Sequence, residues 1–363
     1  MKATVLQKDF TKILTVASRF VSSRAQLPIL SNIKISSKGT KIIVEATNLE
    51  MSISASLGAK VDSDGEVAVP SRVITDLVGN IRGEKIILSS EGEMLSLSTE
   101  GFSADITGLN TADFPQIPGE VSKGVSFSVE DFSGALDKTL FSSSPDDTRP
   151  ALAGILLAFS EKGMSLVSSD GFRLSQKNLA VKDVKEGRVI IPKGILSEIS
   201  RLSSGEKNME IFVDEDNKQV LFEVGDMVLS SRLVEGEYPP FEKIIPESSS
   251  IIVNVSKADF QNAIKTASVF ARDGANIVKL SIKENSLMIS AESSVSGKQE
   301  ALIDAKVKGP EIDIVYNYRY LEEFLAVVRG ESVTAKFNSP ESAGVFLDTD
   351  DEDYLHLVMP VKS

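Results

Sequence analysis

The sequence contains no cysteine and a single histidine, His356, among its 363 residues. The lack of cysteine excludes disulfide bonds, thiolate metal ligands and a cysteine nucleophile. With one histidine, most zinc sites and most acid–base catalytic centres are excluded as well. His356 stands between Leu355 and Leu357, so we expect it to have a structural role.

Long apolar stretches are also absent. No uncharged apolar run is long enough to cross a bilayer, and the first twenty residues carry Lys8, Asp9, Lys12 and Arg19 where a signal peptide would be apolar. We therefore expect a cytoplasmic protein. The composition, with 42% hydrophobic and 25% charged residues, is typical of a soluble globular chain, and the length favours two or three domains.

Common catalytic motifs are missing too. A phosphate-binding loop is excluded because Val125 follows Gly119 and Gly124 where lysine is required. A Gly-x-Ser-x-Gly nucleophile motif does not occur. The acidic run Asp348–Asp353 lacks the central glycine and distal glutamate of a calcium loop, and we interpret it as a solvated loop. These absences argue against an enzyme, and we expect no metal or cofactor.

One unit of about 120 residues is repeated three times along the chain. Each copy begins with an alternating strand that runs into a helix, at Ala3–Phe10, Val125–Phe132 and Ile252–Phe260. Two alternating segments joined by a polar turn follow, which predicts a β-hairpin at Asn32–Ser36 with Lys41–Ala46, Gly154–Phe159 with Met164–Ser168, and Val278–Ile282 with Ser286–Ala291.

A second helix and a closing pair of strands complete each copy. The second helices begin at Pro70–Arg72, Pro192–Gly194 and Asn317–Arg319, where proline or asparagine suits a helix start. Closing strands are predicted at Lys85–Ser89 with Leu95–Thr99 and at Met209–Val213 with Val220–Val224. Two helices and a mostly antiparallel sheet per copy predict an α+β chain of three domains, at residues 1–120, 121–247 and 248–363, with proline-rich linkers between them.

The net charge of −13 argues against a protein that grips nucleic acid with its whole surface. The predicted helices are nevertheless richer in Lys and Arg than in Asp and Glu. Basic residues recur along the first helix of copies one and three, at Lys8, Lys12 and Arg19 and at Lys257, Lys265 and Arg272, whereas the corresponding helix of copy two is acidic. This pattern favours a positive field confined to one surface of an otherwise acidic protein.

Six motifs, in this order and spacing, resemble the bacterial DNA polymerase III beta subunit family, the beta sliding clamps, over the whole chain. They are Leu27–Asn32, Thr47–Met51, Ala112–Pro115, Ser168–Leu174, Leu233–Pro239 and Val358–Pro360. The resemblance implies the DNA clamp fold and a head-to-tail homodimer, in which six domains form a ring around duplex DNA. It also implies a processivity factor for DNA replication that tethers the replicative polymerase and is placed on DNA by a separate clamp loader.

The resemblance assigns residues to DNA contact and to dimer formation. The predicted DNA-binding residues, which include the basic helix positions, are Arg24, Arg72, Arg149, Lys193, Lys12, Arg19 and Lys265. The predicted dimer interface joins the strand around Ser103–Thr107 to the segment near Val269 and Phe270, with Ile106 and Phe270 at its apolar centre.

The resemblance further implies an apolar pocket between the second and third domains. In this family, polymerase subunits, the clamp loader and repair proteins insert a short linear motif there, a glutamine followed by leucine and aromatic residues. The predicted pocket residues are Leu152, Ser169, Gly171, Phe172, Arg173, Leu174, Pro239, Ile244, Gly344, Leu357, Met359 and Lys362. Phe172 replaces the histidine of many relatives and Lys362 the arginine of some, so the peptide preference is expected to differ.

Two other functions remain open at this stage. The first is a repeat-built scaffold that binds peptides and does not act on DNA. The second is an enzyme that uses a metal held by the carboxylates of Asp348–Asp353.

Overall fold

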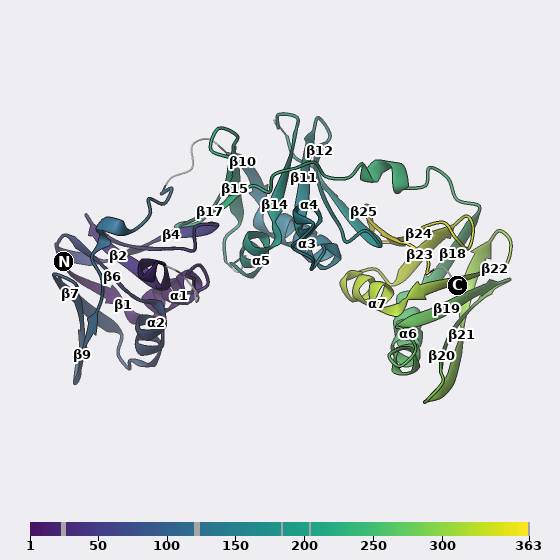
Figure 1. Cartoon of the computed structure of the whole chain (residues 1–363), viewed down its shortest axis with the longest axis horizontal. Helices are drawn as coiled ribbons and strands as arrows, with labels where there is room; N and C mark the ends of the chain where they lie inside the picture. Colours follow the sequence, from purple (N-terminus) through teal and green to yellow (C-terminus); the bar gives the residue numbers. More distant parts are fainter. Residues whose placement is uncertain (23–26, 120–123, 183, 203–204, 362–363) are drawn as a thin grey trace. The chain divides into compact units, whose positions relative to one another are not determined.

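The computed structural model describes residues 1–22, 27–119, 124–182, 184–202 and 205–361. The chain forms two compact units. Unit 1 comprises Met1–Val129 and Ser204–Leu233, and unit 2 comprises Glu130–Ser203 and Val234–Ser363. Figure 1 shows the elements of both units.

The predicted pair of helices is confirmed in each of the three copies. The pairs are α1 (Gln7–Ala17) with α2 (Ser71–Asn80), α3 (Val129–Thr139) with α5 (Lys193–Leu202), and α6 (Lys257–Ala271) with α7 (Tyr318–Val327). One further turn, α4 (Pro150–Ala153), and the 3-10 helices η1 (Pro28–Ser31), η2 (Thr111–Asp113), η3 (Leu140–Ser142) and η4 (Phe241–Ile244) were not predicted. Within the described ranges, every helix is too short or too polar for a bilayer crossing.

Unit 1 contains two antiparallel sheets. The first has the order β5-β1-β7-β8-β9, and the second has the order β10-β15-β16-β17-β4-β3-β2-β6. Their strands are β1 (Lys2–Leu6), β2 (Asn32–Lys38), β3 (Lys41–Thr47), β4 (Met51–Gly58), β5 (Lys60–Ser63), β6 (Gly65–Pro70), β7 (Lys85–Glu91), β8 (Met94–Thr99), β9 (Phe102–Thr107), β10 (Val125–Ser128), β15 (Asn208–Asp214), β16 (Gln219–Val224) and β17 (Met227–Arg232).

The second sheet of unit 1 joins strands of the first and second copies. Strand β17 pairs with β4, with Leu229 opposite Ile53. The buried hydroxyls of Ser52 and Ser230 share a hydrogen bond of 2.6 Å across this junction. Helix α1 packs beside α2, and Phe10 and Leu14 of α1 are completely buried.

Unit 2 contains one antiparallel sheet of twelve strands in the order β14-β11-β12-β13-β25-β24-β23-β18-β21-β20-β19-β22. The strands are β11 (Gly154–Ser160), β12 (Gly163–Ser169), β13 (Arg173–Leu179), β14 (Gly187–Pro192), β18 (Ile251–Ser256), β19 (Ile277–Lys283), β20 (Ser286–Ser293), β21 (Gly297–Lys308), β22 (Ile312–Asn317), β23 (Ser332–Phe337), β24 (Gly344–Asp348) and β25 (Asp351–Val358). Figure 1 shows α6 and α7 side by side against the strands of the third copy.

His356 lies in the core of unit 2, as the sequence indicated. Its side chain is completely buried, its ring stacks on Phe324 with centroids 5.2 Å apart, and its Nδ1 shares a hydrogen bond of 2.9 Å with the Ser175 hydroxyl. Burial, and then the positive charge of Arg173, lowers the pKa of His356 to about 3. The imidazole is therefore neutral at physiological pH.

The interpretation of Asp348–Asp353 as a solvated loop was wrong for Asp348 and Asp351. Thr349 and Asp350 form the tight turn between β24, which ends at Asp348, and β25, which begins at Asp351, and Asp348 is only 2% exposed. Lys138 contacts both Asp348, at 3.5 Å, and Asp351, at 2.5 Å, and Lys177 contacts Asp351 at 2.6 Å. The carboxylates of Asp348 and Asp351 therefore form ion pairs with lysines of the second copy, whereas Asp350, Glu352 and Asp353 are exposed. In the described part of the chain, no group of three or more His, Cys, Asp and Glu is arranged to hold a metal.

Candidate functional site

Strand pairing in unit 2 brings predicted pocket residues of the second and third copies together. Strand β13 pairs with β25, and β25 pairs with β24, so that Leu174 stands opposite Leu357 and Arg173 opposite Val358. Gly344 lies opposite Val358 on the next strand. The backbone N–H of Met359 donates to the carbonyl of Phe172 at 2.8 Å, which extends the ladder beyond β25.

The segment Ser169–Arg173 forms a closed loop between β12 and β13. Asp170 Oδ1 accepts hydrogen bonds from the backbone N–H groups of Phe172, at 2.9 Å, and Arg173, at 3.0 Å. The Ser169 hydroxyl accepts from the N–H of Gly171 at 3.0 Å and donates to the carbonyl of Arg173 at 2.7 Å. Gly171 has a φ of +92°, a backbone conformation that favours glycine. Phe172 stands 60% exposed on this loop.

The linker that precedes the third copy packs against the same part of the sheet. Phe241 of η4 is buried in an apolar cluster with Leu174 and Leu357, and Tyr238 packs against this cluster. Arg188 Nη2 forms an ion pair of 2.6 Å with Glu242 that ties η4 to β14. The linker is therefore held on the sheet by both apolar and ionic contacts.

The predicted pocket residues fall into a buried group and an exposed group. Leu174, Leu357, Ser169, Arg173 and Gly344 are buried, and Leu152 in α4 is half-buried. Gly171, Phe172, Pro239, Ile244 and Met359 are exposed, with Phe172 at 60%, Ile244 at 46% and Met359 at 37%. Lys362 lies outside the described residues. Exposed apolar side chains suit the anchoring of a short peptide.

Arg173 occupies an internal position under the loop and is only 8% exposed. Its guanidinium donates to Asp170 Oδ2 at 3.1 Å, to the carbonyl of Phe141 at 2.7 Å and to Glu323 of helix α7. The guanidinium also contacts two aromatic rings. Arg173 Cζ lies 4.6 Å from the ring centroid of Tyr320 and 5.4 Å from that of Phe141. Sequence reasoning included Arg173 but missed these partners, because Glu323 and Tyr320 come from the third copy and no local motif marks them.

The predicted DNA-binding residues are distributed over both units. In unit 1, Lys12 on α1, Arg19 just after α1 and Arg72 on α2 are exposed. In unit 2, Lys265 is exposed on α6, Lys193 is partly buried at the start of α5, and Arg149 forms an ion pair of 3.4 Å with Asp146. Arg24 lies outside the described residues.

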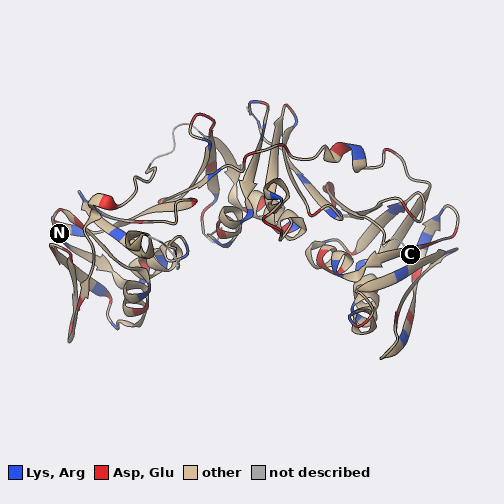
Figure 2. Cartoon of the chain, viewed as in Figure 1, with Lys and Arg blue, Asp and Glu red and all other residues tan. Residues whose placement is uncertain are grey.

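Arg149 lies close to the loop of the predicted peptide site. A Cβ atom placed on Gly171 would be 3.4 Å from Arg149 Nη1. The predicted DNA-binding and peptide-binding sets thus meet at this position within unit 2. Figure 2 shows positive and negative residues distributed over helices and strands of the chain, so neither sign is confined to one kind of element.

The residues predicted for the dimer interface differ in accessibility. Ile106 on β9 is 5% exposed and packs within its own sheet, whereas Val269 on α6 is 59% exposed. Phe270 is half-buried against the core of the third copy. Strand β9 is the last strand of its sheet, so it presents an edge.

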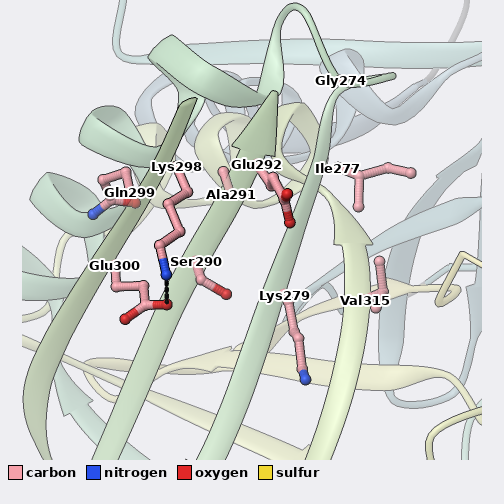
Figure 3. Close-up of a pocket in the computed structure, with 10 residues that line it drawn as sticks. All are labelled: Gly274, Ile277, Lys279, Ser290, Ala291, Glu292, Lys298, Gln299, Glu300 and Val315. Atoms are coloured by element: carbon pink, nitrogen blue, oxygen red, sulfur yellow. Dashed lines mark ion pairs between the residues drawn. The ribbon is translucent and has the colours of Figure 1, made fainter. Parts of the chain in front are cut away.

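A pocket of about 270 Å³ in the third copy shares no residue with these predicted sets (Figure 3). Two of its charged lining residues pair with each other, because Lys298 contacts Glu300 at 3.7 Å, and Lys279 contacts Asp313 at 2.7 Å.

Comparison with protein families covers nearly the whole chain. Residues 1–118 match the model of the N-terminal domain of the DNA polymerase III beta subunit, residues 126–240 match its central domain and residues 242–362 its C-terminal domain. The three models match in chain order.

Individual relatives agree with the family models. The beta sliding clamps of Staphylococcus epidermidis and Staphylococcus aureus are each 29% identical to this chain, and the alignments cover 100% of both sequences. Among solved structures, the DNA polymerase sliding clamp of Bacillus subtilis has a TM-score of 0.95 at 24% identity, covering 100% of this chain and 99% of that chain. The DNA polymerase III beta chain of Streptococcus pneumoniae has a TM-score of 0.94 at 25% identity and covers 100% of both.

Proposed function

The chain belongs to the family of the DNA polymerase III beta subunit, and on this basis we propose that it is a sliding clamp that encircles duplex DNA and tethers the replicative polymerase. The observation that carries the proposal is the ordered match of three domain models of one family along the chain. A ring holds DNA by topology, so weak attraction to phosphates that ignores sequence is sufficient. A tethered polymerase gains effective concentration at the primer end.

The proposed ring is a head-to-tail homodimer in which each chain supplies three domains, at residues 1–120, 121–247 and 248–363. A heterologous contact of this kind closes into a ring when two subunits complete one rotation. Two features support the proposal. Strand β9 is an edge strand, which offers backbone groups for pairing with a second chain, and Val269 exposes apolar surface on α6.

DNA contact is assigned to basic side chains of the helices and neighbouring loops. Lys12, Arg72 and Lys265 are exposed on α1, α2 and α6, which supports this assignment. Arg19, Arg24, Arg149 and Lys193 complete the proposed set. The chain as a whole has a net charge of −13. If only these positions attract DNA, the rest of the protein surface repels it.

Partner proteins are proposed to bind at the surface formed by the loop Ser169–Arg173, the end of β25 and the linker around η4. Phe172, Ile244 and Met359 expose apolar surface, and Leu174 and Leu357 belong to one buried apolar cluster, which supports this site. Polymerase subunits, an ATP-driven clamp loader and repair proteins would each present a short apolar motif to it. The protein itself acts without catalysis, in the cytoplasm.

Two measurements test the proposed function. Size-exclusion chromatography with light scattering and electron microscopy should give a dimer and a ring, and a stable monomer at micromolar concentration without rings would contradict the clamp. After loading by the cognate clamp loader, the protein should stay on nicked circular DNA and leave the same DNA once it is linearised. If the protein leaves circular and linearised DNA equally fast but still binds the peptide, the scaffold function is favoured instead.

A further inference from the structure

The guanidinium of Arg173 links the proposed peptide site to helix α7. It donates hydrogen bonds to two carboxylates. One is Asp170 of its own loop, and the other is Glu323, which is 150 residues further along the chain. Tyr320, one turn before Glu323 on α7, covers the guanidinium at 4.6 Å. Because Arg173 is 8% exposed, these contacts replace water around the charge and do not merely supplement it.

Asp170 connects this guanidinium to the backbone of the exposed loop. One oxygen of Asp170 accepts from Arg173 Nε, and the other accepts from the N–H groups of Phe172 and Arg173. A shift of the guanidinium would therefore move Asp170 and with it the two amides. Phe172, whose side chain is 60% exposed, would lose its orientation.

The electrostatics of the neighbouring Lys193 agree with this arrangement. Burial, and then the positive charge of Arg173, lowers the pKa of Lys193, whereas the negative charge of Glu323 acts in the opposite direction. Glu323 thus compensates two cations. If Glu323 lost its negative charge, the positive charges of Arg173 and Lys193 would be less well compensated, and both side chains are partly removed from water.

We propose that Glu323 is a positioning residue of the peptide site: from α7 it holds the Arg173 guanidinium against Asp170, and this contact fixes the loop that presents Phe172. The inference rests on the proposed binding of partner peptides at this surface. Glu323 does not touch the peptide. It acts through Arg173, so its effect is on the geometry of the loop.

The test compares purified full-length variants in their binding of one probe. The probe is a fluorescein-labelled synthetic peptide with a glutamine followed by leucine and phenylalanine, and binding is followed by fluorescence polarisation. Glu323→Ala is expected to weaken binding about tenfold, the effect of losing one hydrogen bond to a buried charge. Glu322→Ala is the matched control, because it removes the same charge from the neighbouring position of α7. In the described structure Glu322 has no hydrogen bond or ion pair with Arg173.

Conservative substitutions separate positioning from a general loss of structure. Glu323→Asp keeps the carboxylate and should recover most of the affinity, while Glu323→Gln keeps only the hydrogen-bonding oxygen and should be intermediate. In an Arg173→Met background, Glu323→Ala should have no further effect, because its partner is gone. If Glu323→Ala fails to fold, the Gln and Asp variants carry the comparison.

The outcomes distinguish this inference from the function on which it rests. Wild-type protein that does not bind the peptide would contradict the proposed peptide site. Normal binding by the wild type, with equal affinities for the Glu323→Ala and Glu322→Ala variants, would overturn only the role of Glu323. The role of Glu323 would also be overturned if Glu323→Ala lost peptide affinity and Glu323→Asp did not restore it.

Discussion

Asp351 is the carboxylate on which two buried lysines depend, and its replacement by asparagine tests how unit 2 holds the second and third copies together. Lys138 Nζ lies 2.5 Å from Asp351 Oδ2 and Lys177 Nζ lies 2.6 Å from Oδ1. The side chains are only 7%, 14% and 18% exposed for Lys138, Lys177 and Asp351. Asparagine keeps the shape of the side chain and removes its charge.

The expected loss of stability depends on which partners each lysine keeps in the variant. Breaking a buried ion pair by removing one partner costs about 3–5 kcal/mol, because the remaining charge is left uncompensated. Lys138 keeps Asp348 at 3.5 Å and the ring of Tyr354 at 5.0 Å, whereas Asp351 is the only carboxylate in an ion pair with Lys177 among the described residues. We therefore expect Asp351→Asn to lower the free energy of unfolding of this region by about 3 kcal/mol.

Hydrogen exchange measured by mass spectrometry suits this prediction, because a chain of several domains need not unfold in one step. Peptides that cover β13 and β25 should exchange faster in the Asn variant. Asp353→Asn, at an exposed position of the same strand, β25, is the control and should change the free energy by less than about 0.5 kcal/mol. Equal protection of β13 and β25 from hydrogen exchange in the two variants would show that the Asp351 ion pairs do not stabilise this region.

The same carboxylate predicts a dependence on pH. Burial alone would raise the pKa of Asp351, but the hydrogen bonds from Lys138 and Lys177 outweigh it and hold the pKa below its usual value. A carboxyl whose pKa is lower in the folded state stabilises the fold above its unfolded pKa of about 3.9 and loses this effect as the pH falls through the folded value. Acidification below about pH 4 should therefore destabilise the wild type more than the Asn variant.

Three further predictions concern the site and the core. Met359→Ala should weaken peptide binding without opening the dimer, whereas Leu174→Ala, at a completely buried position, should also cost about 2–5 kcal/mol of stability in a thermal melt; unchanged peptide affinity in both would contradict the site. His356 is the only histidine, so its ring gives one set of NMR signals, and these should not shift between pH 8 and pH 5, because burial lowers the pKa to about 3; a midpoint near 6.5 would contradict its burial. Gly344→Ala would place a Cβ atom against the Tyr316 hydroxyl and 2.9 Å from the Phe337 ring, so it should destabilise the third copy by about 1–3 kcal/mol, and an unchanged melting temperature would contradict the packing.

The helices and hairpins of this fold were predictable because their signals are local. The spacing of Leu321, Phe324 and Val328 indicates an amphipathic helix without reference to any other part of the chain, and all three are buried. The hairpins predicted at residues 32–46 and 278–291 are confirmed as β2 with β3 and β19 with β20. Repetition strengthened each signal, because the same order of elements occurred three times.

Strands that pair across copies were not predicted. The junction of β17 with β4 joins residues 227–231 to residues 51–55, and the junction of β13 with β25 joins residues 173–177 to residues 354–358. Each strand is short, and nothing in its own residues identifies a partner so distant in sequence. The register follows from the packing of whole copies against one another.

The sequence by itself therefore determined the repeats, the fold class and the set of residues that resembles a clamp, because periodicity and motif order are properties of neighbouring residues. Only the tertiary structure decided what surrounds each charge. Asp348 and Asp351 were interpreted as solvated acids, but Lys138 and Lys177 lie beside them in the fold. Arg173 was predicted only as a residue of the peptide pocket, but in the fold it forms an ion pair with Glu323 of α7. The environment of a charge depends on burial and on partners that folding brings from far along the chain, and these alone decide whether it is solvated, paired or positioned for binding.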